Sequence, residues 1–410
     1  MNINEERLIK VIEEIGNIGA QPENGITRLA YSEEYSQAVA LLSRRMREAG
    51  LEVRTDGIGN LYGLRRGKSD NLPVILIGSH LDTVKNGGLY DGNLGVCAAL
   101  ELIRVMNEND VWTKHPIEIV AFTAEEGDTY GGTFGSRVIT GLQDVDAAWL
   151  LERLKDNGIT RQDMIDSKRD MSEICAFLEL HIEQGGALEM KRRRIGIVSG
   201  IAGISRCHIT VRGETNHAGT TPMALRKDAL LATAKLINQI DIISRQIGDP
   251  FVSTVGVLSL KPGFINVIPG EVEMTLEMRD LEQSRIEDAL GRIRQTASKI
   301  ENAEIEIELA MEKPPVKTDE RIIELMEYIC RESAISYQVM PSGAGHDAKA
   351  LAQFVPTGML FIPSIGGKSH CKEEISTSND IVLGTEVLLK TVLALDKVLV
   401  SDGGYIPVYL

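Results

Sequence analysis

Two segments near the N-terminus repeat apolar residues at the spacing of an amphipathic helix. They read EERLIKVIEEIGNIG (residues 5–19) and SEEYSQAVALLSRRMREAG (residues 32–50). Apolar side chains three and four positions apart lie on one face of a helix, and a glycine such as Gly50 commonly ends one. The pattern therefore predicts two surface helices at the start of the chain.

Short apolar runs follow, and helix-patterned segments separate several of them. These runs are NLYGLRRG (60–67), PVILIGSH (73–80), IEIVAFTAEE (117–126), AFLELHIEQG (176–185) and TGMLFIPSIGG (357–367). Short buried strands that alternate with helices are typical of a parallel sheet covered on both faces. We therefore expect an α/β fold built on a mostly parallel sheet.

The pattern changes between about Ser205 and Val316. SRCHITVRGE, FVSTVGVLSL, EVEMTLEMRD and AEIEIELAM read as strands, whereas RKDALLATAKLINQIDIISRQ and SRIEDALGRIRQTASKI read as helices. The order βαββαβ describes a separate α+β domain, and the paired prolines of EKPPVKTD suit a linker. We predict an inserted domain at residues 206–316 within a catalytic domain formed by residues 1–205 and 317–410.

Composition narrows the class of protein. A chain of 410 residues with a net charge of −15 is large enough for two domains and repels nucleic acid and anionic lipid. The five cysteines have no CxxC spacing, so neither a disulfide framework nor a thiolate zinc cluster is indicated. The start of the chain does not read as a signal peptide, and no apolar run of about 18 residues occurs. We expect a cytoplasmic protein that binds neither nucleic acid nor membrane.

Ligand-type side chains gather where the predicted strands end. Ligands of open parallel sheets bind outside the carboxyl ends of the strands, and histidine with carboxylate suits Zn²⁺, Mn²⁺, Co²⁺ or Ni²⁺. Asp91, at the start of a helical segment, is placed to share one oxygen with each of two ions. The candidates at strand ends are His80, Glu125, Glu126, His181 and His370.

Two further roles follow from spacing. Asp82, two residues after His80, can accept the other imidazole N–H and fix the tautomer. Glu125 and Glu126 are neighbours at a strand end, where side chains point to opposite faces. We therefore expect one of them to bind metal while the other acts as general base.

Eight blocks of the chain resemble one family. GSHLDTV, YDGNLGV, AEEG, LELHIEQG, RGETNHAGTTPM, INVIPGEVEMTLEMRD, SGAGHDA and IPSIGGKSH occur in the order seen in the hydantoinase/carbamoylase-type amidases. These are two-metal hydrolases of the wider aminoacylase and carboxypeptidase superfamily. The resemblance covers nearly the whole chain and implies two divalent ions per subunit.

The resemblance also implies a role for each matching residue. His80, Asp91 and His181 would bind one ion, Asp91 would bridge to a second ion held by Glu126 and His370, and Glu125 would be the general base. The inserted domain would be the lid and dimerisation domain, from which His217 would reach into the partner subunit's site and stabilise the oxyanion. The resemblance implies that Asn266 and Arg279 contact the substrate carboxylate and that Gln184 lines the ureido end. Gly345 and His346 are further candidate substrate contacts. His346 with Asp347 has the alternative role of ordering a glycine loop.

The expected reaction is hydrolysis of a small carboxylated ureido or amide substrate. An N-carbamoyl-L-amino acid would give the amino acid, carbon dioxide and ammonia. Allantoate amidohydrolase and β-ureidopropionase activities use the same chemistry, and N-acyl amino acid or peptide hydrolysis is a further alternative. A scaffold that had lost catalysis would lack a ligand or the base, and this chain retains all of them.

Overall fold

The computed structural model describes residues 1–21, 23–69 and 71–399, with the side chain of residue 128 left out. The chain divides into two compact units, which are described separately. The first unit comprises Met1–Ser199 with Thr318–Leu410, and the second comprises Gly200–Lys317. The segment 206–316, expected as an inserted domain, lies within the second unit. Among the described residues, no helix combines the length and apolar character needed to cross a bilayer.

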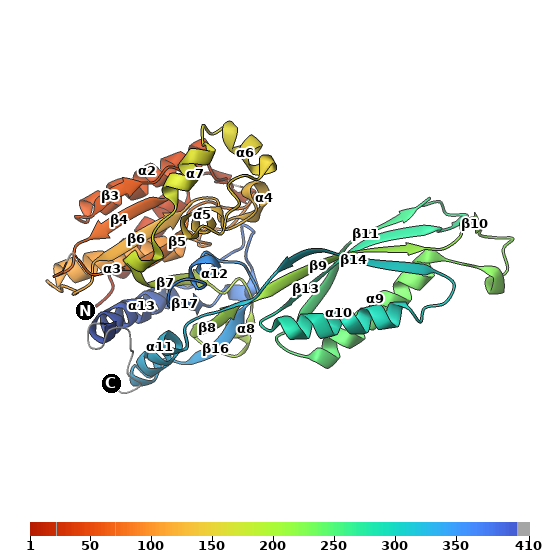
Figure 1. The fold of residues 1–410 in the computed structure, drawn as a ribbon. Coiled ribbons are helices and arrows are strands. Elements are labelled where there is room, and N and C mark those ends of the chain that lie inside the picture. Colours follow the sequence, from red (N-terminus) through yellow and green to blue (C-terminus); the bar gives the residue numbers. More distant parts are fainter. Residues whose placement is uncertain (22, 70, 400–410) are drawn as a thin grey trace. The chain divides into compact units, whose positions relative to one another are not determined.

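Most of a nine-stranded sheet belongs to the first unit, while its strand β15 and the last two residues of β8 fall within the bounds of the second. The central strands β6, β5, β7 and β17 run parallel (Figure 1). The parallel centre agrees with the predicted mostly parallel sheet, and the flanking strands β4, β3 and β8 are antiparallel to their neighbours. In spatial order the strands are β15 (Val316–Lys317), β8 (Ile195–Ile201), β17 (Thr357–Ile362), β7 (Ile174–Ile182), β5 (Val74–His80), β6 (Ile117–Phe122), β4 (Leu61–Arg65) and β3 (Glu52–Thr55), while β16 (Tyr337–Ser342) pairs with β8.

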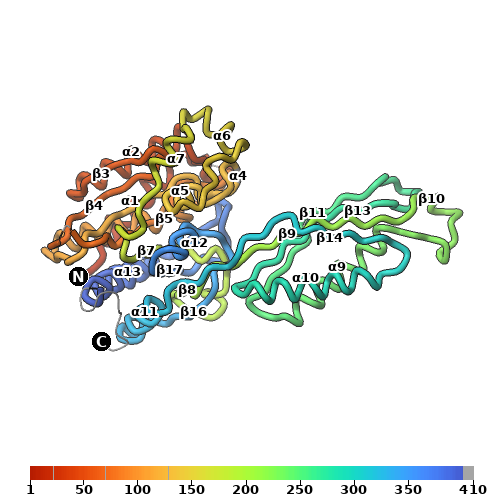
Figure 2. The backbone as a smooth tube through the Cα atoms, in the orientation of Figure 1, coloured from red at the N-terminus to blue at the C-terminus, as the bar shows by residue number. Residues whose placement is uncertain are grey.

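The parallel pairs join segments that are distant in sequence. Leu360 of β17 lies opposite Leu180 of β7, and Ile77 of β5 lies opposite Leu178 of β7. Figure 2 traces β7 and β17 side by side although the second unit separates them along the chain. The carboxyl ends of β5, β6, β7 and β17 therefore meet along one edge of the sheet.

Helices cover both faces of this sheet. The main hydrophobic core joins one face to five long helices, and the two N-terminal helices expected from the sequence are confirmed. These helices are α1 (Glu5–Gly16), α2 (Glu33–Glu48), α3 (Asn93–Glu108), α11 (Glu320–Glu332) and α13 (Ser378–Leu399). A smaller cluster on the other face involves α4 (Gly127–Tyr130), α5 (Phe134–Thr140), α6 (Ala148–Lys155) and α7 (Arg161–Ser167), and α12 (Ala348–Leu351) packs against β7 and β17.

Helix caps fix where α1 and α2 begin. The side chain of Asn4 accepts a hydrogen bond from the amide of Arg7, and Ser32 accepts one from the amide of Tyr35. Such caps satisfy backbone donors that the first turn leaves open. The short remaining elements of this unit are β1 (Ala20–Gln21), β2 (Gly25–Ile26), α8 (Ala187–Met190) and the 3-10 turns η1 (Met171–Glu173) and η3 (Ile365–Gly367).

The second unit is an antiparallel four-stranded sheet with two helices on one face (Figure 1). Its strands alternate between side chains buried under the helices and side chains on the outer face, as β13 does with Met274 and Met278 buried and Glu273 exposed. The elements are β9 (Gly203–Arg212), β10 (Asn216–His217), η2 (Met223–Leu225), α9 (Ala229–Ile247), β11 (Val252–Lys261), β12 (Val267–Ile268), β13 (Glu271–Asp280), α10 (Gln283–Ala297) and β14 (Glu304–Lys313). The main elements follow the order βαββαβ.

Candidate active site

The first unit brings the predicted metal ligands together at the carboxyl ends of its parallel strands. His80 ends β5, and His181 is the penultimate residue of β7. Asp91 lies two residues before the start of α3, and His370 lies in the loop after β17. Groups of three that can share one ion are His80, Asp91 and His181 on one side, and Asp91, Glu126 and His370 on the other.

Asp91 lies at the centre of the cluster, and its two carboxylate oxygens face different partners. His80 Nε2 and His181 Nε2 lie 3.4 and 3.2 Å from Oδ1. His370 Nε2 lies 3.2 Å from Oδ2. Two donor atoms bound to Zn²⁺ at 2.0–2.1 Å in a tetrahedron lie about 3.3 Å apart. The spacing therefore fits an aspartate that gives one oxygen to each of two ions.

The two strand-end histidines turn Nε2 toward Asp91 and hold Nδ1 at a backbone carbonyl oxygen. His80 Nδ1 lies 3.0 Å from the backbone oxygen of Asp82, and His181 Nδ1 lies 2.8 Å from that of Ile182. A carbonyl oxygen only accepts, so both Nδ1 atoms carry the proton. The Gly92 amide donates to His181 Nε2 at 3.3 Å. Burial opposes a charge on these rings, but the hydrogen bond to Asp91 raises the pKa of both histidines. A cation bound at Nε2 in place of that proton would likewise lie between each ring and Asp91.

Other polar atoms of the cluster are also suited to metal binding. Glu126 Oε1 and Gln184 Oε1 are buried and make no hydrogen bond within the described part of the chain. Buried oxygens without partners are costly unless an ion or water satisfies them. Gln184, which is expected to contact the ureido end of the substrate, donates from Nε2 to Asp91 Oδ2 at 2.8 Å.

Both carboxylates of the Glu125–Glu126 pair face the cluster, contrary to the expectation that neighbours diverge. Both belong to one group with His80, and Glu125 Oε2 lies 3.9 Å from His80 Nε2. The reason is that the pair lies in a turn beyond β6, where Ala124 has a left-handed φ of 54°. The strict alternation of a strand therefore no longer applies.

Asp82 supports this turn rather than the imidazole of His80. Its Oδ1 and Oδ2 accept the amides of Glu125 and Glu126 at 3.2 and 3.0 Å. Its carboxylate lies 3.8 Å from His80 Nδ1, too far for a hydrogen bond, because the backbone oxygen of Asp82 takes that place. The prediction that the Asp82 carboxylate accepts from His80 is therefore wrong, because the backbone oxygen of Asp82 makes this contact. The carboxylate instead holds the backbone of Glu125 and Glu126.

The electrostatics of the turn suit proton transfer. Burial raises the pKa of Glu125 well above that of an ordinary glutamate, and the charges of Glu126 and Asp347 add to the effect. Burial together with the charge of Asp91 raises the pKa of Glu126 to about 7. A general base works best with a pKa raised toward the working pH, so the shift of Glu125 agrees with its expected role. The pKa shift of Glu126 reflects burial and the charge of Asp91 and does not distinguish a metal ligand from a base.

His346 is buried behind His181. Its ring centroid lies 4.6 Å from that of His181, and its Nε2 lies 2.9 Å from Ser342 Oγ. Burial and the nearby His181 hold its pKa well below the usual range, so the ring is neutral. Gly345 is exposed in the loop before it. Contact of either residue with substrate stays a prediction.

Two buried carboxylates at the site were missed in the sequence analysis. Glu179 accepts from Ser79 Oγ at 2.8 Å and from the Ala348 amide at 3.0 Å, and it shares a strand face with His181 two positions later. Glu374 accepts the amides of Tyr90 and Asp91 at 2.8 and 3.1 Å. The two-residue spacing could have indicated Glu179, whereas nothing local indicates a contact between Glu374 and a loop more than 280 residues earlier.

The other predicted residues, His217, Asn266 and Arg279, belong to the second unit. His217 Nδ1 accepts the amides of Gly219 and Thr220 at 3.0 and 3.2 Å, so its Nε2 carries the proton of the neutral ring. Asn266 is exposed, and its backbone oxygen accepts the Ala218 amide at 2.9 Å. Arg279 is bound to Glu277 Oε1 through Nε and Nη2 at 2.8 and 2.7 Å.

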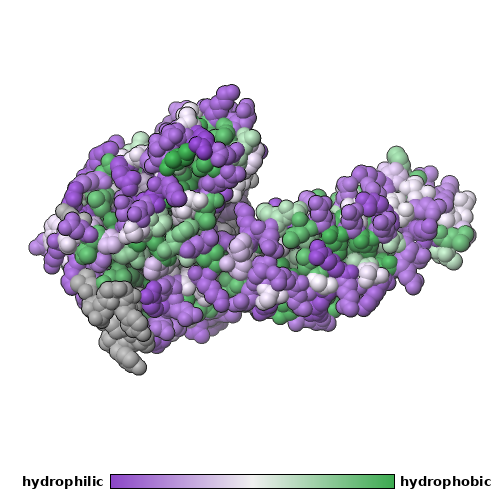
Figure 3. Space-filling view, viewed as in Figure 1, coloured by the Kyte–Doolittle hydropathy of each residue, from purple (hydrophilic) through white to green (hydrophobic). Residues whose placement is uncertain are grey.

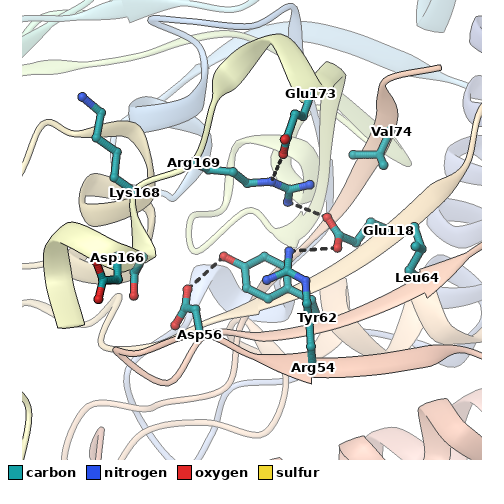
Figure 4. A pocket seen from close by; sticks show the side chains of 11 residues that line it. Arg54, Asp56, Tyr62, Leu64, Val74, Glu118, Asp166, Lys168, Arg169 and Glu173 are labelled. Carbon is teal, nitrogen blue, oxygen red and sulfur yellow. Dashed lines mark hydrogen bonds and ion pairs between the residues drawn. The ribbon is translucent and has the colours of Figure 1, made fainter. Parts of the chain in front are cut away.

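A separate pocket of about 420 Å³ in the first unit contains none of the predicted site residues (Figure 4). Within it, buried Glu118 accepts from Arg54 at 3.1 Å and from Arg169 at 2.5 Å. Arg54 lies over the ring of Tyr62 at 3.9 Å. These charges pair with one another and connect β3 and β6 to the segment before η1.

A parallel sheet that carries histidine and carboxylate ligands at its strand ends, beside a buried glutamate, defines a hydrolase suited to divalent ions. Comparison with known sequences agrees with this class. The model of peptidase family M20/M25/M40 matches residues 76–394, and the chain belongs to this family.

Curated relatives indicate the reaction more closely. The chain is 41% identical to an N-carbamoyl-L-amino acid amidohydrolase of Geobacillus stearothermophilus over 94% of this chain and 97% of the relative. It is 36% identical to an allantoate amidohydrolase of Escherichia coli, over 92% and 94%. A crystal structure of a hydantoinase/carbamoylase family amidase from Burkholderia ambifaria matches with a TM-score of 0.88 at 33% identity, over 96% and 98%. The resemblance is confirmed, and the chain is an amidohydrolase that cleaves C–N bonds.

Proposed function

We propose that the enzyme hydrolyses the ureido C–N bond of an N-carbamoyl-L-amino acid. One water is consumed, and the amino acid, carbon dioxide and ammonia are released. The observation that carries the proposal is Asp91 shared between two ligand groups beside Glu125, in a chain that is 41% identical to a relative named for this reaction.

The residues that would hold the ions are His80, Asp91 and His181 for one and Asp91, Glu126 and His370 for the other. The ligand set suits Zn²⁺, Mn²⁺, Co²⁺ or Ni²⁺. When bound, such ions act as Lewis acids that lower the pKa of water and polarise a carbonyl.

Glu125 supplies the proton transfers in this proposal. It takes a proton from the attacking water and delivers it to the departing nitrogen when the C–N bond breaks. Asp82 holds the amides of Glu125 and Glu126, so the base keeps its position while its charge changes. Gln184, bonded to Asp91, is placed to contact the ureido end.

We propose that recognition of the substrate carboxylate and of the oxyanion requires two subunits. Arg279 lies near the end of β13 that pairs with the start of β9, whereas His217 and Asn266 lie beyond the opposite end. The eight residue-to-residue steps from Glu271 to Arg279 span about 26 Å at about 3.3 Å per step. One small substrate cannot reach both ends of this sheet, so the partner subunit's His217 would serve the site.

Exposed apolar side chains on the second unit support a homodimer. The edge strand β11 carries several of them, and Figure 3 shows hydrophobic surface at the end of this unit that bears β10. Exposed apolar side chains of this kind can take part in an interface, and an open edge strand pairs readily with another chain. The exposed residues are Met223, Leu225, Val252, Val257, Leu258, Phe264 and Ile265.

Allantoate amidohydrolase is the second candidate function. The observation in its favour is the relative of that name in Escherichia coli. Allantoate also presents a carboxylate and a ureido group, so the same residues would act on it. The difference between the two candidates lies in what surrounds the substrate's central carbon.

The deciding experiment measures ammonia release by metal-loaded enzyme from N-carbamoyl-L-amino acids, N-carbamoyl-β-alanine and allantoate in parallel. We expect the highest kcat/KM on an N-carbamoyl-L-amino acid, loss of activity with a chelator, and recovery with Mn²⁺, Co²⁺, Ni²⁺ or Zn²⁺. A preference for allantoate would replace the first candidate by the second. Turnover that a chelator leaves unchanged would overturn the metal chemistry.

A further inference from the structure

Glu374 joins two loops that each carry a proposed metal ligand. It is buried, and its Oε1 accepts the backbone amides of Tyr90 and Asp91 at 2.8 and 3.1 Å. Its Oε2 accepts the hydroxyl of Ser369, the residue before His370, at 2.7 Å. The Glu374 carboxylate thus connects the backbone at Asp91 to the loop that carries His370.

The His370 loop needs such an anchor. His370 has a left-handed φ of 55°, which is costly for a residue other than glycine, and its side chain is 49% exposed. His80 and His181, in contrast, lie on central strands and are almost fully buried. Without a fixed loop, His370 would lose its orientation more easily than the strand-borne ligands.

Ser369 brings the connection to Asp91 itself. Its hydroxyl oxygen lies 3.2 Å from Asp91 Oδ2, the same oxygen that faces His370. A glycine at position 88 leaves room for Glu374, because a Cβ there would lie 2.1 Å from its carboxylate. The absence of a side chain at Gly88 therefore leaves space for the Glu374 carboxylate.

We propose that Glu374 is a positioning residue that sets the affinity of the ion bound by Asp91, Glu126 and His370. The inference rests on the metal-dependent function proposed above. Removing groups that orient a metal ligand from outside typically weakens metal binding 10- to 100-fold. The ion held by His80, Asp91 and His181 depends less on Glu374, since two of its three ligands are fixed by strands.

The test is a titration of the metal-free chain with Mn²⁺, read by calorimetry and by metal content after gel filtration. We expect two ions per wild-type chain. In Glu374→Ala, the Kd of one ion should rise tenfold or more, while that of the other changes less than threefold. Glu374→Gln can still accept both amides through its oxygen and should recover most of the affinity. Ser369→Ala removes one arm without removing a buried charge and should weaken the same ion.

Glu118→Gln is the matched control, because Glu118 is also buried, takes part in two ion pairs and lies outside the ligand groups. It should lower the Tm and leave both Kd values unchanged. If Glu374→Ala bound both ions as tightly as the wild-type chain, or lost affinity for both ions equally, the positioning role of Glu374 would be overturned. The proposed metal chemistry would not be affected by either result. A wild-type chain that binds no ion would overturn the proposed metal chemistry and this inference with it.

Discussion

The reaction depends on a few side chains that the turn after β6 holds in place. The proposal assigns no ion to Glu125, and burial raises its pKa. Its neighbour Glu126 differs from it in facing His370, with 3.6 Å between Oε1 and Nε2. Two adjacent residues of one type therefore take separate roles because of what each one faces.

Replacing Glu125 by glutamine should separate catalysis from metal binding. The amide keeps the size of the side chain but cannot accept the proton of the attacking water, so kcat should fall by about 10²- to 10⁴-fold. Metal content, measured by elemental analysis, should stay at the wild-type value. Wild-type turnover in Glu125→Gln would remove Glu125 from its assigned role.

Arg279→Lys should raise KM about tenfold or more with a smaller effect on kcat. An ammonium cannot reproduce the two parallel N–H bonds that a guanidinium offers a carboxylate. Arg206 is the matched control, since it pairs with Glu277 from the neighbouring strand. Arg206→Lys should leave KM unchanged, and equal KM values in both variants would exclude Arg279 from substrate binding.

Gly92→Ala should disturb the ligand His80. A Cβ at position 92 would lie 2.5 Å from the imidazole ring, and the φ of 64° disfavours any side chain. The Kd for the ion at His80 should rise at least tenfold in a metal titration. Gly127→Ala, where a Cβ meets no atom within 4 Å, serves as the control.

Some of the site residues could be predicted from the sequence, whereas the contacts of others could not. His80 and His181 could be found because a strand pattern precedes each one. The backbone oxygen of Asp82, which takes the place expected for its carboxylate, follows from local turn geometry that residue identity does not encode. The role of Glu374 could not be predicted, because its partners Tyr90 and Asp91 are distant in sequence.

Strands and helices decide where these side chains meet. The apolar runs predicted the strands, and the helices between them predicted the parallel centre of the sheet. The run NLYGLRRG gave no indication that β4 pairs antiparallel with β6, because pairing direction depends on partners distant in sequence. The alternation of the second unit could be predicted more fully, since each of its strands has one buried and one outer face.

Glu118 links three elements at the edge of the large sheet, and its loss should lower stability. It lies on β6 and pairs with Arg54 of β3 and with Arg169 just before η1 (Figure 4). Removing one member of a buried ion pair leaves the charge of the other uncompensated. We expect the free energy of unfolding to fall by about 3 kcal/mol, the lower end of the range for buried pairs. Urea unfolding of Glu118→Gln should report this loss, while kcat at low temperature stays the same.

The complete enzyme, in the proposal, is a pair of chains. Its second unit bears His217 at one end of a sheet and Arg279 at the other, and its exposed apolar residues suit a second copy. The division into two units could be predicted from the change of pattern near Ser205. Their mutual placement in the working enzyme depends on contacts that no local pattern encodes.

Mixing two inactive variants tests the exchange of residues between subunits. If the partner subunit's His217 acts in each site, a heterodimer of Glu125→Gln and His217→Ala contains one site with both native groups. Random reassociation makes half of the dimers mixed, so activity should return to about a quarter of wild type. Activity that stays at the level of the separate variants would show that His217 acts within its own chain or has no role.

Anomalous diffraction from crystals grown with Mn²⁺ or Zn²⁺ locates the ions on which the whole mechanism depends. We expect two peaks in each subunit, one among His80, Asp91 and His181 and the other among Asp91, Glu126 and His370, with Asp91 bound to both. Electron density in which these side chains point apart, with no peak between them, would contradict the account.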